Sequence, residues 1–273
     1  MMFGPLLSPV PGERHAHSLK LHRGPHFGEV SILPVQPRRR RNPTFRRDGM
    51  ACAILYLPLG VAANSATKPT GRGGARNRVD RTSRALSATQ VGNLIAAARH
   101  ARVIGLPLNR MVTIHWQTAG VPLKATARAT GRFVDLMSKT ISRQGGGGTA
   151  WIWVHENGDQ KGAHCHLLAH VPSCAIATIT RLQKGWLRLI TGEPYKAKVI
   201  RSRPIGLRSG MEVTNPDSYS ANLDAALFYC LKGATPAAAK RFGLDRLEAG
   251  GRVIGKRCGA SQNIGAKARK MKE

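Results

Sequence analysis

The stretch from residue 151 to residue 172 constrains the fold of this chain most, because it has the pattern of two strands joined by a tight turn. Residues 151–155 are rich in aromatic and β-branched side chains, and residues 163–171 are apolar apart from their histidines. Between them, the sequence Asn-Gly-Asp at residues 157–159 is typical of turns. We therefore predict an antiparallel β-hairpin.

The hairpin also carries candidate metal ligands. Successive side chains of a strand point to opposite faces, so His164 and His166 share one face while Cys165 points to the other. A third ligand would come from the partner strand, where either Glu156 or His155 reaches the same face, depending on the register of the hairpin. We favour the carboxylate of Glu156. The competing interpretation is that these histidines are ordinary residues of a half-buried sheet.

A second pattern lies on a helix that we predict over residues 220–233. Ser220 is a favourable N-cap residue, and Gly233 is a typical helix terminator. Tyr229 and Lys232 are three residues apart, so they share one face near the C-terminal end of this helix. Taken alone, a tyrosine on an amphipathic helix is most often a core residue.

These two patterns together resemble the motifs of the HUH endonucleases, the superfamily of rolling-circle replication initiators, relaxases and related transposases. His164 and His166, after Glu156, are similar to the metal-binding motif of that family. Tyr229 and Lys232, in the expected order along the chain, resemble the nucleophile motif of its single-tyrosine members. The resemblance covers residues 109–233, and no helicase segment follows it.

The resemblance implies a nuclease domain over residues 81–273 of the α+β class. Its core would be an antiparallel sheet of about five strands, a ferredoxin-like or RRM-like palm, with helices packed on it. Glu156, His164 and His166 would hold Mg²⁺ or Mn²⁺. Tyr229 would attack single-stranded DNA at a replication origin, assisted by Lys232, and form a 5′-phosphotyrosine that can later be rejoined. A replication initiator of a plasmid or phage is the first expectation, and relaxases and transposases share the chemistry.

Other elements follow from local patterns. Ser87 and Gln90 form a capping-box pattern that predicts a helix start. Alternation predicts a strand over residues 109–116, where the first motif of the family matches loosely and where we interpret His115 as a polar residue of the sheet face. Apolar residues at helical spacing predict helices over residues 125–143 and 174–190.

The charge of the chain indicates a polyanionic partner. There are 43 lysines and arginines against 14 aspartates and glutamates, a formal net charge of +29. The excess persists after residue 80, where 30 basic and 10 acidic residues remain. Nucleic acid is the leading candidate partner. Charge alone does not separate a nuclease from a ribosomal protein, a nucleoid protein or a protein that binds a membrane surface.

Two basic segments are candidate DNA contacts. Residues 195–203 are predicted as a strand, with Lys196, Lys198 and Arg201 available to phosphates. The same alternation would also suit an edge strand guarded by charges. Near the C-terminus, Lys256 and Arg257 lie among glycines that permit a close approach to phosphates, although a solvated basic tail would look similar.

The first 80 residues differ from the rest of the chain. They hold nine of the 16 prolines and a run of four arginines at residues 38–41, so we predict a disordered basic arm. The apolar segment at residues 51–63 resembles the core of a secretory signal only if translation starts at Met50, and it is too short to span a bilayer. We expect a cytoplasmic protein with no membrane partner.

The five cysteines are scattered and form no C-x-x-C pair, so neither a disulfide scaffold nor a zinc ribbon is indicated. The alternative to the enzyme hypothesis is a non-catalytic nucleic-acid-binding protein. In that case His164 and His166, with Cys174 as a third ligand, would hold a structural zinc ion.

Overall fold

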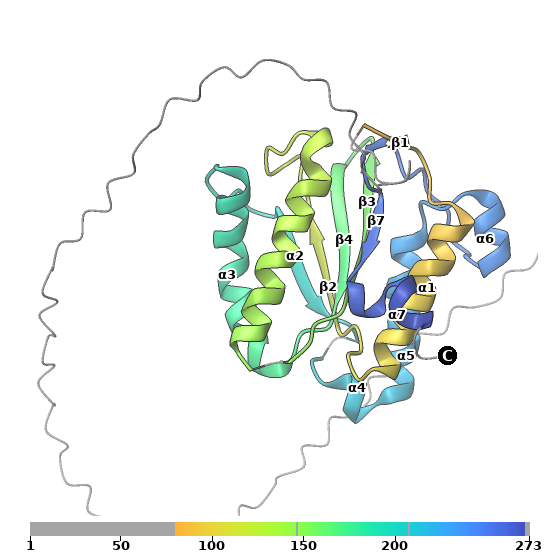
Figure 1. Ribbon diagram of the computed structural model, residues 1–273. Coiled ribbons are helices and arrows are strands. Elements are labelled where there is room, and N and C mark those ends of the chain that lie inside the picture. The colour runs from red at the N-terminus through yellow and green to blue at the C-terminus, as the bar shows by residue number, and fades with distance from the viewer. Residues whose placement is uncertain (1–79, 146, 207, 271–273) are drawn as a thin grey trace, which may run out of the picture. The chain divides into compact units, whose positions relative to one another are not determined.

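A five-stranded antiparallel sheet organises the part of the chain that the structure, a computed structural model, describes (Figure 1). This part comprises residues 80–145, 147–206 and 208–270. The strand order is β5-β2-β4-β3-β7. The strands are β2 (Arg110–Ile114), β3 (Trp151–Gly158), β4 (Gly162–Ala169), β5 (Ile200–Pro204) and β7 (Cys258–Ala260). The α+β class and the antiparallel sheet predicted from the sequence are confirmed. The predicted arm and the apolar segment at residues 51–63 lie outside the described residues, except for Asp80.

β3 and β4 form the predicted hairpin. Their pairing runs from Trp151 opposite Ala169 to Gly158 opposite Gly162, which leaves residues 159–161 as the turn. β4 is the central strand, because it also pairs with β2. The strand that carries the candidate ligands His164 and His166 is therefore paired with another strand along both of its edges.

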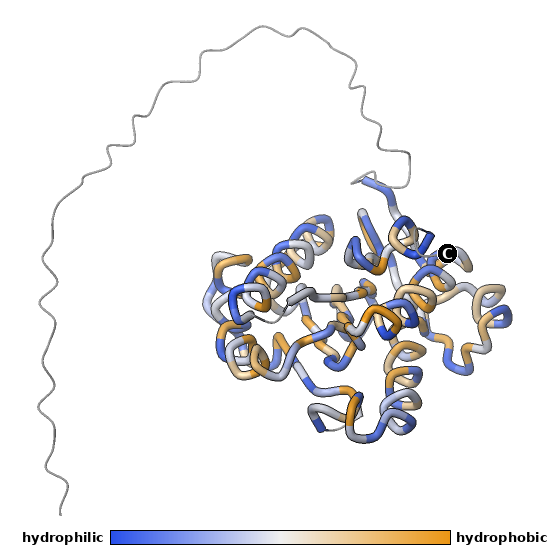
Figure 2. The backbone as a smooth tube through the Cα atoms, turned by 60° about the horizontal axis from the view of Figure 1, so that its bottom comes forward, coloured by the Kyte–Doolittle hydropathy of each residue, from blue (hydrophilic) through white to orange (hydrophobic). Residues whose placement is uncertain are grey.

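Two helices cover one face of this sheet. α2 (Thr126–Arg143) and α3 (Ser173–Thr191) pack against it and against each other. Phe133 and Trp186 meet edge to face at 5.5 Å between ring centroids. Both helices match their predicted extents closely, and Figure 2 shows hydrophobic and hydrophilic residues alternating along the helices, as expected for helices with one face on a sheet.

The opposite face is covered by α1 (Ala88–Val103) and α5 (Pro216–Leu231), as Figure 1 shows. The capping box of Ser87 and Gln90 is confirmed at the start of α1. Shorter elements follow elsewhere in the chain: β1 (Thr82–Ser83) paired with β6 (Val253–Ile254), α4 (Met211–Thr214), α6 (Pro236–Phe242), α7 (Ala266–Lys270) and a 3₁₀ turn at Gln262–Ile264. A further 3₁₀ turn, Leu123–Ala125, leads directly into α2 on the other side of the sheet.

α5 begins earlier than predicted. Its N-cap is Asn215, whose side chain accepts a hydrogen bond from the Ser218 amide, and not Ser220. Pro216 suits the first helical position, because an N–H group there would have no acceptor within the helix and its absence costs no hydrogen bond. The extra turn lets Tyr219 pack in the core and donate a hydrogen bond to the Leu108 carbonyl at 2.9 Å.

The predicted strand over residues 195–203 is partly wrong. Regular pairing begins only at Ile200, because residues 197 and 198 form a turn and Lys198 has a φ of 65°. A lysine in the left-handed region does not continue a strand. No described helix has both the length and the apolar character needed to cross a membrane.

Candidate metal centre and tyrosine pocket

The register of the hairpin brings three candidate ligands together. Glu156 lies directly opposite His164, and alternation along β4 puts His166 on the same face. The Nε2 atoms of His164 and His166 lie 3.2 Å and 3.6 Å from Glu156 Oε2. All three side chains are buried, and one ligand atom from each lies within 4.8 Å of the others. This group can hold a metal ion.

His155 points to the other face of the sheet and is not part of the group. Its Nε2 lies 2.8 Å from the Thr130 hydroxyl, and its Nδ1 lies 3.1 Å from the Lys256 carbonyl. Burial lowers the pKa of His155 to about 4, so the imidazole stays neutral there. Of the two candidates, Glu156 therefore lies with His164 and His166, and His155 does not.

Neighbouring groups orient both histidines. His164 Nδ1 donates a hydrogen bond to the Gly162 carbonyl at 2.8 Å, and His166 Nδ1 lies 3.1 Å from the Thr113 hydroxyl. These contacts turn both Nε2 atoms toward Glu156. Burial lowers the pKa of His166, against the opposing effect of Glu156, and a neutral ring offers the lone pair that a metal ion needs.

Two atoms of this group lack a protein partner. Glu156 Oε1 and His166 Nε2 are buried, and neither has a hydrogen-bond partner within the described part of the chain. A buried polar atom left in this state costs on the order of 1–3 kcal/mol. A carboxylate oxygen and an imidazole nitrogen are both atoms that can coordinate a metal ion, so a bound cation would satisfy them together. One carboxylate and two imidazoles suit ions such as Mn²⁺, Fe²⁺ or Zn²⁺.

No described cysteine belongs to the Glu156, His164 and His166 group. Cys165 points to the opposite face, and burial raises its pKa to about 12. Cys174 is exposed at the start of α3, where its sulfur lies 3.9 Å from the Gln144 carbonyl. Cys174 is therefore not available as the third ligand of the structural-zinc alternative.

Lys232 supplies the positive charge nearest to the group. It is 2% exposed, its ammonium contacts the Glu156 carboxylate, and it lies 3.5 Å from Glu248 Oε2. Burial alone would raise the pKa of Glu156. Hydrogen bonding with His164, His166 and Lys232 outweighs burial and holds that pKa well below its usual range. Glu156 is therefore ionised at neutral pH.

Removing the Lys232 ammonium is expected to destabilise the metal-free protein. Lys232→Met keeps the length of the side chain but leaves the buried carboxylate without its cation, a loss of about 3–5 kcal/mol. Mn²⁺ should raise the Tm of this variant more than that of the wild type, because the ion takes over the neutralisation. Thermal unfolding with and without Mn²⁺ measures both effects. Exposed Lys240→Met is the control, and an unchanged Tm for metal-free Lys232→Met would contradict the assignment.

Tyr229 reaches the same side of the sheet from α5. Its ring centroid lies 5.1 Å from that of His166, in an edge-to-face arrangement, and the Lys232 ammonium lies 4.9 Å from the ring centroid. A pocket of about 270 Å³ opens beside it. The pocket is lined by Met111, Thr113, His115, Lys161, His164, His166, Arg201, Arg203 and Tyr229. One pocket is thus lined by Tyr229, by both histidines and by three basic side chains.

The predicted DNA contacts fall in different places. Arg201 lines the pocket, opposite Thr113 on the neighbouring strand. Lys196 and Lys198 are exposed in the loop before β5. Lys256 is also exposed, but its ammonium lies 5.7 Å from the ring centroid of Trp153, a residue on the face opposite the candidate metal centre.

The prediction that Arg257 contacts DNA is wrong. It is 2% exposed, and its guanidinium donates to the carbonyls of Ser83, His155, Gly250 and Gly251. Because these contacts use its donors inside the protein, Arg257 fixes the loops around β7 and is not available to a phosphate.

The sequence prediction missed several pocket residues. Arg203 and Thr113 could have been found, because each is two residues from a residue on the same face of its strand, Arg201 and His115 respectively. His115 was interpreted as a polar residue of the sheet face, yet it lines the pocket with its ring 5.6 Å from that of His164. Lys161 comes from the hairpin turn, and nothing in its local sequence indicates this position.

No family model, curated protein or solved structure matches this chain. The chemistry of the site is therefore inferred from its own residues and their geometry.

Proposed function

We propose that this protein is a metal-dependent enzyme that nicks and rejoins single-stranded DNA through a covalent bond to Tyr229. One observation carries the proposal: the Tyr229 ring lies 5.1 Å from that of His166, above a buried Glu-His-His group that can hold a metal ion. A candidate nucleophile and a candidate metal centre on separate elements thus meet in one basic pocket.

The reaction is a transesterification at phosphorus. The phenol oxygen of Tyr229 forms a bond to the phosphorus and loses its proton to water in the pocket. The bond between phosphorus and the 3′ oxygen of the preceding nucleotide breaks, and that oxygen takes up a proton. The products are a 5′-phosphotyrosine and a free 3′-hydroxyl, and the reverse reaction rejoins the strand.

The residues of the pocket have distinct roles in this proposal. Lys161, Arg201 and Arg203 bind the backbone phosphates on either side of the scissile bond. Glu156, His164 and His166 would hold a divalent ion, Mn²⁺ or Mg²⁺, which when bound supplies Lewis-acid polarisation of the phosphate. The imidazole nitrogens favour Mn²⁺ over Mg²⁺. Lys232 balances the Glu156 charge and provides positive potential near Tyr229.

The topology supports a ferredoxin-like or RRM-like palm as part of this proposal. The elements β2, α2, β3, β4, α3 and β5 follow one another along the chain, with α2 and α3 on one face. These four strands lie in the order β5-β2-β4-β3. A strand–helix–strand unit is repeated, as in the ferredoxin-like motif. Initiation of rolling-circle replication at a plasmid or phage origin is the role that we propose, and a relaxase or transposase would use the same site.

The test is formation of a denaturation-resistant adduct. We expect the protein, incubated with end-labelled single strands and Mn²⁺, to give a labelled band that survives denaturation, together with a product that has a free 3′-hydroxyl. EDTA should abolish the band, and Mn²⁺ in excess should restore it. Adding a strand with a 3′-hydroxyl should consume the adduct and yield a joined strand. Cleavage that gives no adduct at any time would refute the proposed mechanism.

A further inference from the structure

The outer surface of α2 and α3 is strongly basic, on the side of the sheet away from Tyr229. Its only acidic residue on these two helices, Asp135, is paired with Lys139 at 2.9 Å. None of the other basic residues of this surface has an ion pair within the described ranges. The exposed basic residues of this surface, counting the 3₁₀ turn before α2, are Lys124, Arg128, Arg132, Lys139, Arg143, Arg181, Lys184 and Arg188.

The spacing of these charges is unfavourable in the isolated protein. Arg128 and Arg132 are four residues apart on α2, and Lys184 and Arg188 are four residues apart on α3. Like charges at this spacing face each other and weaken a helix. A polyanion bound across both helices would remove that repulsion, whereas a surface that only needed to be soluble could mix acidic residues among the basic ones.

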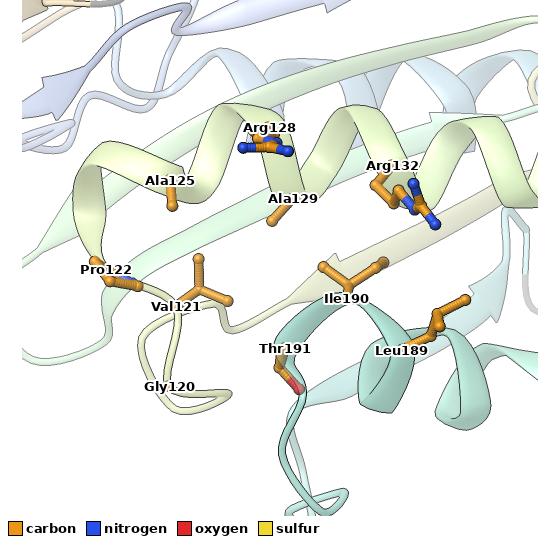
Figure 3. Close-up of a pocket in the computed structure, with 10 residues that line it drawn as sticks. All are labelled: Gly120, Val121, Pro122, Ala125, Arg128, Ala129, Arg132, Leu189, Ile190 and Thr191. Carbon is orange, nitrogen blue, oxygen red and sulfur yellow. The ribbon is translucent and has the colours of Figure 1, made fainter. Parts of the chain in front are cut away.

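A pocket lies between α2 and α3 on this surface. It has a volume of about 360 Å³ and is lined by Arg128 and Arg132 of α2 and by Leu189 and Ile190 of α3; Figure 3 shows Arg132 extending toward these two apolar side chains. Leu189 is 61% exposed. Guanidinium groups beside an apolar surface attract an anion more strongly than the same groups surrounded by water, because the local dielectric is lower.

The side chains of this surface favour a duplex over a single strand. Proteins that bind single strands offer aromatic rings on which bases stack. The aromatic residues of α2 and α3, Phe133 and Trp186, are both buried. Tyr195, beside Lys184 on the same side of the sheet, is half-buried, and the Lys184 ammonium lies 5.3 Å from its ring centroid. Contacts are therefore mainly with the phosphate backbone, which a duplex presents outermost. The basic row from Lys124 to Arg143 would extend along roughly 28 Å of a duplex, at a helical rise of ~1.5 Å per residue.

We propose that the outer surface of α2 and α3 binds the phosphate backbone of duplex DNA, separately from the single-strand site at Tyr229. The two sites lie on opposite faces of the sheet, so both can be occupied at once. This inference does not depend on the tyrosine chemistry. A protein with both surfaces would stay on the duplex that flanks the single-stranded segment it acts on.

The test is duplex binding by a variant that lacks two charges of this surface. Arg128→Gln with Arg132→Gln should weaken binding to a blunt duplex by on the order of tenfold, measured by fluorescence anisotropy with the full chain. The slope of log affinity against log salt should fall in magnitude by about two, one for each phosphate contact. Adduct formation on a short single strand should be unchanged.

The matched control removes the same charges from the other side of the sheet. Arg99→Gln with Arg102→Gln changes two exposed arginines of α1. If this control weakens duplex binding as much as the α2 variant, net charge is responsible and the proposal is wrong. Equal losses for duplex and single strand in the α2 variant would also overturn it. Far-UV circular dichroism confirms that both variants are folded.

Discussion

His166→Ala is expected to lower the affinity for Mn²⁺ by at least about 100-fold. Removing a residue that only orients a metal ligand typically costs about 10–100-fold in affinity, so loss of a direct ligand should cost more. Glu156 and His164 remain in the variant, but two ligands on neighbouring strands do not surround an ion. The rate of adduct formation should fall with the occupancy of the site. Isothermal titration calorimetry of the purified protein measures the binding directly.

His170→Ala is the matched control. His170 follows the same strand, but its Nδ1 lies 2.9 Å from the Pro107 carbonyl and it does not belong to the Glu156, His164 and His166 group. Its replacement should leave Mn²⁺ affinity within about threefold of the wild type. If His166→Ala binds Mn²⁺ like the wild type, these three residues are not the ligands and the metal centre must be assigned elsewhere.

Tyr229→Phe is expected to reduce adduct formation by a factor on the order of 10⁴ or more, the usual scale for loss of a nucleophile. Phenylalanine keeps the ring that contacts His166 and Lys232 and removes only the hydroxyl. The fold, the Mn²⁺ affinity and the affinity for single strands should therefore be unchanged. A labelled-strand assay under denaturing conditions measures the loss.

Tyr195→Phe controls for the loss of a tyrosine hydroxyl elsewhere. Tyr195 lies near Lys184 of α3, on the side of the sheet away from the pocket, and its variant should form the adduct at the wild-type rate. Retention of the adduct in Tyr229→Phe would mean that another residue is the nucleophile, even if the metal centre is correct.

The elements that carry the site could be predicted because their signals are local. Aromatic, β-branched and apolar composition on either side of a turn signal defined the hairpin strands, and the spacing of Tyr229 and Lys232 defined their shared helix face. The register could not be predicted, because it depends on the length of the turn at residues 159–161 and because distant segments also pair with the other edge of β3. The His155 amide donates to the Arg257 carbonyl, and the Asn157 amide donates to the Gly250 carbonyl, both of them about 100 residues away along the chain.

The charge pattern of the sequence did not distinguish the buried Arg257 from the exposed basic residues. Arg257 looked like a DNA contact, but its guanidinium is buried and donates to backbone carbonyls, those of Gly250 and Gly251 among them. Arg203, which was not singled out, lies in the pocket because β5 pairs with β2. Only the tertiary structure decides which basic side chains line a common pocket and which are buried in hydrogen bonds with the backbone.

The most direct test of the account is to identify the residue that carries the DNA. The wild-type protein is incubated with a single strand and Mn²⁺, denatured, and digested with a protease and a nuclease, and the peptides are then sequenced by mass spectrometry. We predict a nucleotide attached through a 5′-phosphate to Tyr229. A nucleotide on any other residue, or no modified peptide from a sample in which the strand has been cut, would contradict the account.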